Sequence, residues 1–428
     1  MGGEVKSMRI LVTALSAVLL VAACGRAPVG TLPTSGDYKL YEAASTQSAQ
    51  MVSVIDSRTH SVERSLPLGT PSPDWTHLYS VNSRTLVDMD PKTGATLHST
   101  KLPGDFQLPM ATLSGVPGGL AQNGHWLVLE AFDSPAGSVP TGTHLLLVDT
   151  SYSRAARQVD LPGYFQFDAV SNDGQWIYLV QFVFDTTEYH VRRYDMAAGQ
   201  LDPTIIFDKS DGSAAMTGLR LSGVASPDGR WLYSVYARQD MSAFIHVLSL
   251  DAPIAFCIDL PGSGYAANPD SFQWSLALNR DGSHLYAANG AMGAVVDVNT
   301  AAYGPSITRI IRVASTASAE GPFIQNVQAK EFGANGTVLS PDGRTLVMSG
   351  STGVVWVDAA TLHAQGRQLT DWKVWSLALS PDGSTLYVVN DAGRIAEVAM
   401  TGSHAATTFG GGPGQPLALI RVEAAPVP

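Results

Sequence analysis

The stretch Ser226-Pro227-Asp228-Gly229-Arg230-Trp231-Leu232-Tyr233 recurs along this chain of 428 residues. Closely similar copies occupy residues 340–347 and 380–387. Weaker copies begin at Ser72, Ala121, Ser171 and Asn279. Successive copies start 40 to 61 residues apart. A repeat of about 50 residues is typical of propellers and solenoids, in which each repeat forms one structural unit.

Each copy predicts a unit of four strands. An apolar segment precedes the turn, and a Leu-Tyr segment, a Val-Asp segment and one more strand-like segment follow it. Pro presets the backbone of the turn, Asp hydrogen-bonds its own backbone, and Gly accepts the left-handed conformation. Four short antiparallel strands per repeat correspond to one blade of a β-propeller. We therefore expect an all-β protein that consists of a single propeller.

The repeats resemble those of YVTN-type and TolB-like β-propellers. Residues 78–82, 285–289 and 386–390 are similar to the motif that names the first family, as in Leu-Tyr-Val-Val-Asn at 386–390. The resemblance extends from residue 37 to residue 422, although the repeats that begin at Ala121 and Ser171 depart from the motif. It implies a propeller fold. It also implies alternative functions, because resembling propellers include lactone hydrolases, quinone-dependent or metal-dependent oxidoreductases and envelope-assembly proteins.

The two ends of the repeat region are expected to close the ring. Residues 416–420 match the innermost segments 275–278 and 376–379, but no Leu-Tyr segment follows them. Leu40 and Tyr41 supply that segment, so N- and C-terminal strands are predicted to complete one sheet and to remove an unpaired edge. The seven turn motifs predict seven blades, whereas counting Leu-Tyr-like segments gives eight blades as the alternative.

The composition agrees with many short strands and turns. Gly 41 and Pro 25 are spread along the chain, and 45% hydrophobic with 15% charged residues excludes a disordered protein. The formal net charge is -11 and no cluster of Lys and Arg stands out. A basic footprint for nucleic acid or for an anionic membrane surface is therefore missing, and we expect no nucleic-acid partner.

The N-terminal segment predicts export. Lys6 and Arg9 precede an uncharged apolar run at 10–23, which is the layout of a secretory signal and is too short to span a bilayer. Residues 21–25, Val-Ala-Ala-Cys-Gly, resemble the lipobox of bacterial lipoproteins, in which the cysteine is lipidated. An ordinary signal peptide is the alternative, and Met8 is an alternative start.

The lipobox resemblance implies three regions: a lipoprotein signal peptide at 1–23, a flexible tether at 24–36 and the propeller at 37–424. Lipidated Cys24 would hold the protein at the membrane, facing the extracytoplasmic side (periplasm or cell surface). Cys257 lies in an apolar strand-like segment and is expected to be a small core residue.

One face of the propeller is predicted to carry the binding site. The turns between strands one and two, and between three and four, are short, whereas the connections on the opposite face carry insertions. Variable loops on a rigid scaffold are where binding sites usually lie. The candidate ligand-binding residues on this face are Asp185, Glu188, Tyr189, Asp208, Asp211, Tyr265, Asn268, Asp270, Phe323, Lys330, Glu331 and Phe332. Acidic and aromatic side chains suit a cationic, sugar-like or peptide ligand. Ordinary solvated loops are the alternative interpretation.

No catalytic or metal-binding motif is recognisable in the sequence. The histidines lack the His-Glu-x-x-His spacing, and neither a Gly-x-Ser-x-Gly elbow nor a phosphate-binding loop occurs. We therefore predict no catalytic residue, no metal and no cofactor. The expected function is a binding or interaction scaffold for a protein or a small ligand, with a propeller enzyme as the alternative. A metal site assembled from different blades also stays open.

Two repeated positions are interpreted as structural. The turn aspartates recur because the turn recurs; they are Asp173, Asp228, Asp281, Asp342 and Asp382. An aromatic position just before the second strand is expected to fill a slot between neighbouring blades; it is occupied by His77, Trp126, Trp176, Trp231 and His284.

Overall fold

The computed structural model describes residues 36–111, 115–134, 138–183, 186, 188–212, 214–240, 242–263, 272–301, 304–312 and 336–425. The expected signal peptide, Cys24 and the tether up to residue 35 lie outside these residues. Residues from Asp37 onwards form one compact unit. No helix in the described part is long and apolar enough to cross a membrane.

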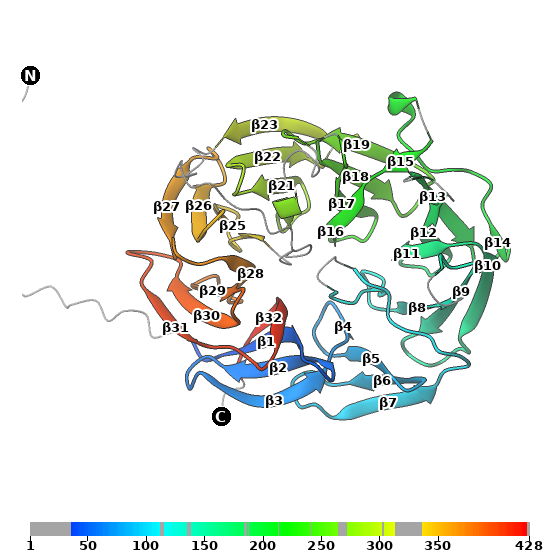
Figure 1. Ribbon diagram of the computed structural model, residues 1–428, viewed down its shortest axis with the longest axis horizontal. Coiled ribbons are helices and arrows are strands. Elements are labelled where there is room, and N and C mark those ends of the chain that lie inside the picture. Colours follow the sequence, from blue (N-terminus) through cyan, green and yellow to red (C-terminus); the bar gives the residue numbers. More distant parts are fainter. Residues whose placement is uncertain are drawn as a thin grey trace, which may run out of the picture. The chain divides into compact units, whose positions relative to one another are not determined.

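Eight sheets follow one another in a ring and form a β-propeller (Figure 1). We number the blades along the chain and give their strands from the inside outwards. Blade 1 consists of β32 (Gln415–Ala424), β1 (Tyr38–Ser45), β2 (Gln50–Asp56) and β3 (Ser61–Pro67). Blade 2 consists of β4 (Thr70–Pro71), β5 (Leu78–Asn82), β6 (Thr85–Met89) and β7 (Thr96–Lys101). Blade 3 consists of β8 (Trp126–Asp133), β9 (Gly142–Asp149) and β10 (Arg157–Pro162). Blade 4 consists of β11 (Phe165–Val170), β12 (Trp176–Phe182), β13 (Glu188–Asp195) and β14 (Gln200–Leu201), and β15 (Met216–Thr217) also pairs with β13.

The second half of the ring is more regular. Blade 5 consists of β16 (Leu219–Ala225), β17 (Trp231–Ala237), β18 (Phe244–Ser249) and β19 (Ala255–Asp259). Blade 6 consists of β20 (Ser275–Leu278), β21 (His284–Asn289), β22 (Ala294–Asn299) and β23 (Ser306–Arg312). Blade 7 consists of β24 (Thr337–Leu339), β25 (Thr345–Ser349), β26 (Val354–Asp358) and β27 (Ala364–Gln368). Blade 8 consists of β28 (Val374–Leu379), β29 (Thr385–Asn390), β30 (Arg394–Ala399) and β31 (Ala406–Gly410). A 3-10 turn, η1 (Lys209–Asp211), lies between blades 4 and 5 in the sequence.

Strands from the two ends of the propeller region close the ring, as predicted. β1 pairs antiparallel with β32, from Tyr38 opposite Ala424 to Ser45 opposite Gln415, and Figure 1 shows the two strands side by side. The first two strands of blade 1 therefore come from opposite ends of the chain, and no Ser-Pro-Asp-Gly turn joins them. Counting turns missed this blade, so the preferred number of seven was wrong and the alternative of eight is correct.

The turn motif is built as its residues predict. In blade 5, the Ser226 hydroxyl donates to Asp228 Oδ1 at 2.5 Å, and the same oxygen accepts from the N–H of Arg230 at 3.1 Å. Gly229 has φ 69°, which is the left-handed region that glycine tolerates. The same Ser-to-Asp hydrogen bond occurs in the turns of Asp173, Asp342 and Asp382. These aspartates are therefore turn residues.

Consecutive turns also pack against one another. A Cβ on Gly383 would lie 2.5 Å from Cδ of Pro341, the proline of the preceding turn. A Cβ on Gly282 would lie 2.9 Å from Cδ of Pro227 in the same way. The repeated turn thus serves the contact between blades as well as the reversal of the chain.

The hydrophobic core is divided among the interfaces between successive blades. Among the described residues, eight clusters of buried side chains each join two neighbouring blades. One cluster packs Leu40 of blade 1 against Tyr387 and Val389 of blade 8, which continues the core across the closure. Close packing at each interface makes the ring a rigid support for its loops.

The aromatic slot between blades is confirmed for Trp126. A Cβ on Gly174, in the turn of the next blade, would lie 2.5 Å from the Trp126 ring. The histidines at the equivalent position make a different contact. His77 and His284 each place Nδ1 2.8 Å from an aspartate of the same blade, Asp88 and Asp297.

Candidate functional site

A cavity of about 340 Å³ opens where blades 3, 4 and 5 meet. Its lining residues lie near the end of β8 and β12 and near the start of β13 and β16. The ends of β8 and β12 connect to β9 and β13 in the same blade, and the start of β16 receives the chain from blade 4. The cavity therefore lies on the face that the sequence predicts to carry the insertions.

The structure brings one of the predicted site residues into this cavity. Tyr189 lines it, whereas the neighbouring Glu188 is exposed and outside the lining. Asp208 has a structural role, because its carboxylate accepts from Ser210 N at 2.9 Å and from Cys257 N at 2.8 Å. Asp211 lies in the η1 turn beside it. The remaining candidates fall outside the described residues; they are Asp185, Tyr265, Asn268, Asp270, Phe323, Lys330, Glu331 and Phe332.

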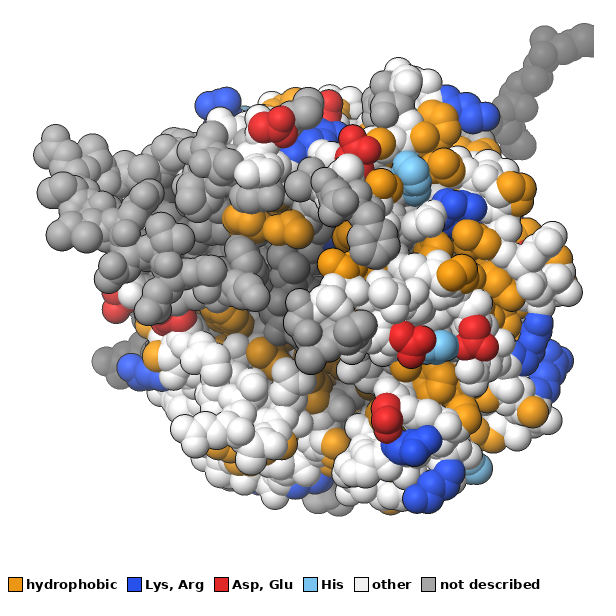
Figure 2. All heavy atoms as spheres, turned by 45° about the vertical axis from the view of Figure 1, so that its right-hand side comes forward, with side chains coloured by type: hydrophobic (Ala, Val, Ile, Leu, Met, Phe, Trp, Pro, Cys, Tyr) orange, Lys and Arg blue, Asp and Glu red, His pale blue; other side chains and the backbone are white. Residues whose placement is uncertain are grey.

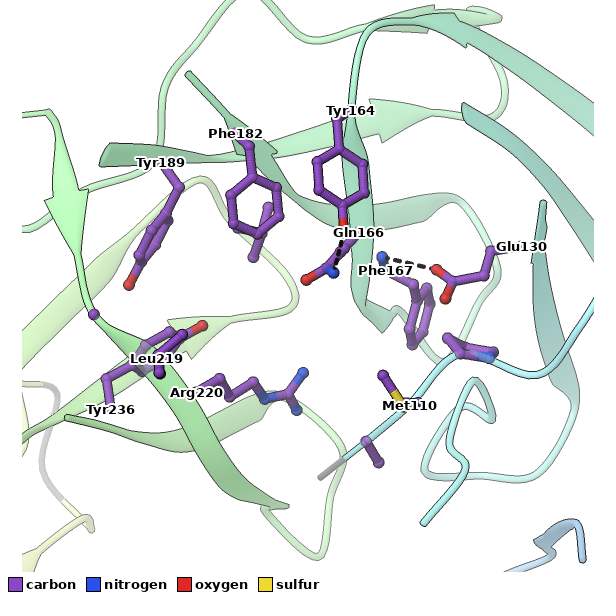
Figure 3. Close-up of a pocket in the computed structure, with 14 residues that line it drawn as sticks. Met110, Glu130, Tyr164, Gln166, Phe167, Phe182, Tyr189, Leu219, Arg220 and Tyr236 are labelled. Carbon is purple, nitrogen blue, oxygen red and sulfur yellow. Dashed lines mark hydrogen bonds between the residues drawn. The ribbon is translucent and has the colours of Figure 1, made fainter. Parts of the chain in front are cut away.

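Aromatic rings form one wall of the cavity (Figure 3). Tyr164 and Phe182 stack with their centroids 4.7 Å apart, and Tyr189 and Tyr236 stack at 5.7 Å. Phe182 joins the two pairs, since its centroid lies 6.4 Å from that of Tyr189. The buried hydroxyls of Tyr189 and Tyr236 have no hydrogen-bond partner in the described part of the chain. The wall thus offers ring faces to a ligand.

Glu130 places a carboxyl group among apolar neighbours. It lies in β8 between buried Leu129 and half-buried Ala131 and is only 7% exposed. Its Oε2 accepts one long hydrogen bond, 3.4 Å, from the backbone N–H of Phe167 in the next blade. Burial raises the pKa of Glu130 to about 7, against the smaller opposing effect of that hydrogen bond. The carboxyl group of Glu130 therefore titrates near neutral pH.

Arg220 approaches the cavity from the other side, as Figure 3 shows. Its Nη1 lies 2.9 Å from Oδ1 of Asp168, whose side chain is fully buried. Behind this ion pair lies His246, 1% exposed, and burial lowers its pKa to about 4. His246 is therefore neutral at pH 7. The charges of Arg220 and Asp168 neutralise each other. Among the described residues that line the cavity, Glu130 is therefore the acidic or basic residue without an ionic partner.

A second cavity of about 750 Å³ adjoins the first. The two share Met110, Glu130, Tyr164 and Gln166 in their linings, and the second extends to Phe132 and towards blades 1 and 2. Gln166 Nε2 donates to the Tyr164 hydroxyl, so these shared side chains are held together. Glu130 consequently lies on the boundary between two hollows, where a ligand in either one can reach it.

The side of blades 3 to 5 carries no broad field of one charge. Figure 2 shows acidic and basic side chains dispersed among hydrophobic ones. Two exposed apolar residues mark the cavity rim, Met110 at 67% and Leu219 at 45% exposure. Recognition here would depend on individual groups inside the cavities. In the described part of the chain, no three His, Cys, Asp or Glu side chains lie close enough to hold a metal ion.

Glu130 and Arg220 are not among the site residues that the sequence predicts. A charged residue inside an apolar strand was the available signal, as in Leu127-Val128-Leu129-Glu130-Ala131-Phe132. Most of the aromatic wall lies in blade 4, and Glu130 lies in blade 3. These are the two repeats that depart from the motif. Cys257 is half-buried and packs against the core cluster between blades 4 and 5.

Solved structures share the fold at low sequence identity. The chain is similar to apo AztD from Citrobacter koseri, with 12% identity and a TM-score of 0.54, covering 91% of this chain and 98% of that one. It is also similar to the dihydro-heme d1 dehydrogenase NirN in complex with DHE, with 14% identity and a TM-score of 0.52, covering 89% and 74%. The periplasmic gluconolactonase PpgL from Pseudomonas aeruginosa gives 18% identity and a TM-score of 0.44, covering 89% and 97%. No protein-family model and no curated protein matches the chain. The likenesses to AztD and NirN, with TM-scores above 0.5, show a shared fold alone.

Proposed function

We propose that this protein is an exported, lipid-anchored β-propeller that binds a small ligand in the cavity between blades 3, 4 and 5. The observation that carries the proposal is a preformed cavity with a stacked aromatic wall and a buried carboxyl group. Ligand sites are typically concave and mostly apolar, with a few polar groups that fix orientation. The lipobox-like residues 21–25 support attachment at the membrane through Cys24. A protein partner on the same face is the other form of this proposal.

The rigidity of the ring supports binding. The cavity-lining strands belong to blades that are packed together by two hydrophobic clusters. A ligand would therefore meet side chains that are already in place, and little conformational entropy would be lost on binding.

Saturation-transfer NMR with indole and 2-phenylethanol tests this function. Both probes carry an aromatic ring and one hydrogen-bonding group, so the wild-type protein should give saturation transfer at millimolar probe. Leu219→Trp should abolish the signal, because this half-exposed rim residue would then fill the cavity mouth. Ile310→Trp is the matched control, since Ile310 is 51% exposed on β23, away from the cavity. An equal signal from both variants would refute binding in this cavity.

The second candidate is an enzyme, and the titration of Glu130 favours it. A carboxyl group whose pKa lies near 7 inside a cavity is suited to act as a general base. Hydrolysis of δ-valerolactone, followed with a pH indicator, would test this candidate. Turnover that is lost in Glu130→Gln would favour an enzyme over a binding protein.

A further inference from the structure

We propose that the ligand presents a protonated amine to Glu130 and that the neighbouring aromatic rings hold its alkyl or aromatic body. This inference rests on the proposed function and assigns the chemical class of the ligand. It follows from which charges on the cavity wall are already paired and which are not.

The charge balance of the lining favours a cation. Asp168 and Arg220 form an ion pair, so neither offers a full charge to a ligand. Glu130 receives one long hydrogen bond, and no cation among the described residues pairs with it. An anionic ligand would meet the carboxyl group of Glu130, while Arg220, the cation on the lining, is already paired with Asp168. An ammonium group would instead gain a charged hydrogen bond inside a poorly hydrated cavity.

The rings around Glu130 also suit an ammonium group. Tyr164 and Glu130 line both cavities together, and the charge of the carboxylate adds to burial in raising the pKa of Tyr164. Phe132 packs edge-on against Tyr164 at 5.6 Å between centroids, and Phe167 lines the first cavity together with Glu130. Aromatic rings attract cations through their negative faces, and this attraction grows as water is removed. The carboxylate of Glu130 and the rings of Tyr164, Phe132 and Phe167 near it would therefore both attract an ammonium group.

The ionisable groups on the elements around Glu130 leave its charge uncompensated. Tyr164 precedes β11, while Asp168 in β11 and Arg220 in β16 form an ion pair with each other. On β9, the ring of His144 is held by Asp133 at 3.1 Å and Asp160 at 2.5 Å. The pKa of Glu130 near 7 then means that binding a cation near neutral pH must displace a proton from its carboxyl group.

Three probes of similar shape separate the possible ligand classes. These are 2-phenylethylamine, the neutral 2-phenylethanol and the anionic 3-phenylpropionate, titrated into the full chain by calorimetry at pH 8. The amine should bind at least about tenfold more tightly than the alcohol. Its affinity should fall towards that of the alcohol as the pH decreases to 5.5, while the alcohol's affinity stays constant. At pH 6.5, amine binding should release protons, measured in two buffers of different ionisation enthalpy.

Glu130→Gln should remove the preference for the amine and leave alcohol binding in place. Glu42→Gln is a matched control, because Glu42 is also buried with a pKa of about 7 but lies outside both cavities. Alcohol that binds as well as the amine would overturn the ammonium assignment and leave the binding function standing. Preferred binding of the carboxylate would assign the site to Arg220 instead and would also overturn it. If none of the three probes binds at millimolar concentration, both the assignment and the binding function fail.

Discussion

The backbone N–H of Gly412 donates a hydrogen bond to Oε2 of Glu42 at 2.5 Å, across the seam where the two chain ends meet. Glu42 is 1% exposed in β1, and Gly412 precedes β32. Burial raises the pKa of this carboxyl group from 4.5 to about 7, although the hydrogen bond acts in the opposite direction. The stability of the ring closure therefore depends on whether Glu42 is protonated.

This coupling predicts that the propeller loses stability as the pH rises. Because the folded-state pKa of Glu42 lies above its unfolded value, its stabilising contribution is complete below pH 4.5 and is lost as the pH rises through 7. A shift of this size corresponds to at most about 3 kcal/mol in the free energy of unfolding. Glu42→Gln should therefore stabilise the protein at pH 8 and change little at pH 5. Urea unfolding at pH 5, 6, 7 and 8 measures the difference, and an unchanged pH profile in the variant would contradict the coupling.

The contact between turns predicts an unequal cost for two equivalent glycines. Gly383→Ala places a Cβ 2.5 Å from Pro341 and should destabilise the ring through both the left-handed backbone and the overlap. Gly343 holds the same place in its turn with φ 72°, but no described atom lies within 4 Å of its Cβ position, because Arg280 replaces the proline of the preceding turn. Gly343→Ala should therefore be milder by about 1–2 kcal/mol. Thermal unfolding compares the two variants. Adding Pro341→Ala should restore stability to Gly383→Ala but not to Gly343→Ala, because only the first overlaps with Pro341.

The fold was predictable because each turn carries its own local signal. Pro, Asp and Gly encode the turn within four residues, and their repetition reveals the blades. Blade 1 escaped the count because its first two strands are joined by hydrogen bonds between β1 and β32 rather than by a turn. The only sequence signal for this closure was residues 416–420, a strand-like segment that no Leu-Tyr segment follows.

The candidate site was less predictable because it depends on which strand ends converge. Glu130 and Arg220 are 90 positions apart in the numbering, yet they line one cavity. The cavity opens on the face that the sequence predicts to carry the insertions, and Tyr189 lines it, but the prediction was otherwise drawn from the inserted loops. The cavity is instead lined mainly by side chains at the ends of strands in the irregular blades 3 and 4 and in blade 5. A search for charged residues within apolar strands would have found Glu130.

Lipid attachment at Cys24 predicts a clear labelling result. When the full chain is expressed in a bacterial host with radioactive palmitate, the wild-type protein should be labelled and should sediment with membranes. Cys24→Ser should lose the label, because the acyl chains need the thiol, and a much larger share should be released by mild washing. Cys257→Ser is the control, since this core cysteine should not affect labelling. Labelling that persists in Cys24→Ser would remove the lipid anchor from the proposed function.

The ion pair between Asp168 and Arg220 predicts a strong effect of removing one partner. Asp168→Asn leaves the guanidinium of Arg220 partly buried without its carboxylate, 2.9 Å away in the native pair, and should cost about 3 kcal/mol in the free energy of unfolding. Replacing both partners, as in Asp168→Asn with Arg220→Met, should recover much of that loss because no charge then remains unpaired.

The pair Arg230 and Asp251 is a matched control on the surface, with side chains 62% and 50% exposed. Asp251→Asn should change stability by less than about 1 kcal/mol. Denaturant unfolding of the three variants distinguishes a structural ion pair from an incidental one. Equal effects for Asp168→Asn and Asp251→Asn would show that Asp168 does not hold Arg220 in place at the cavity.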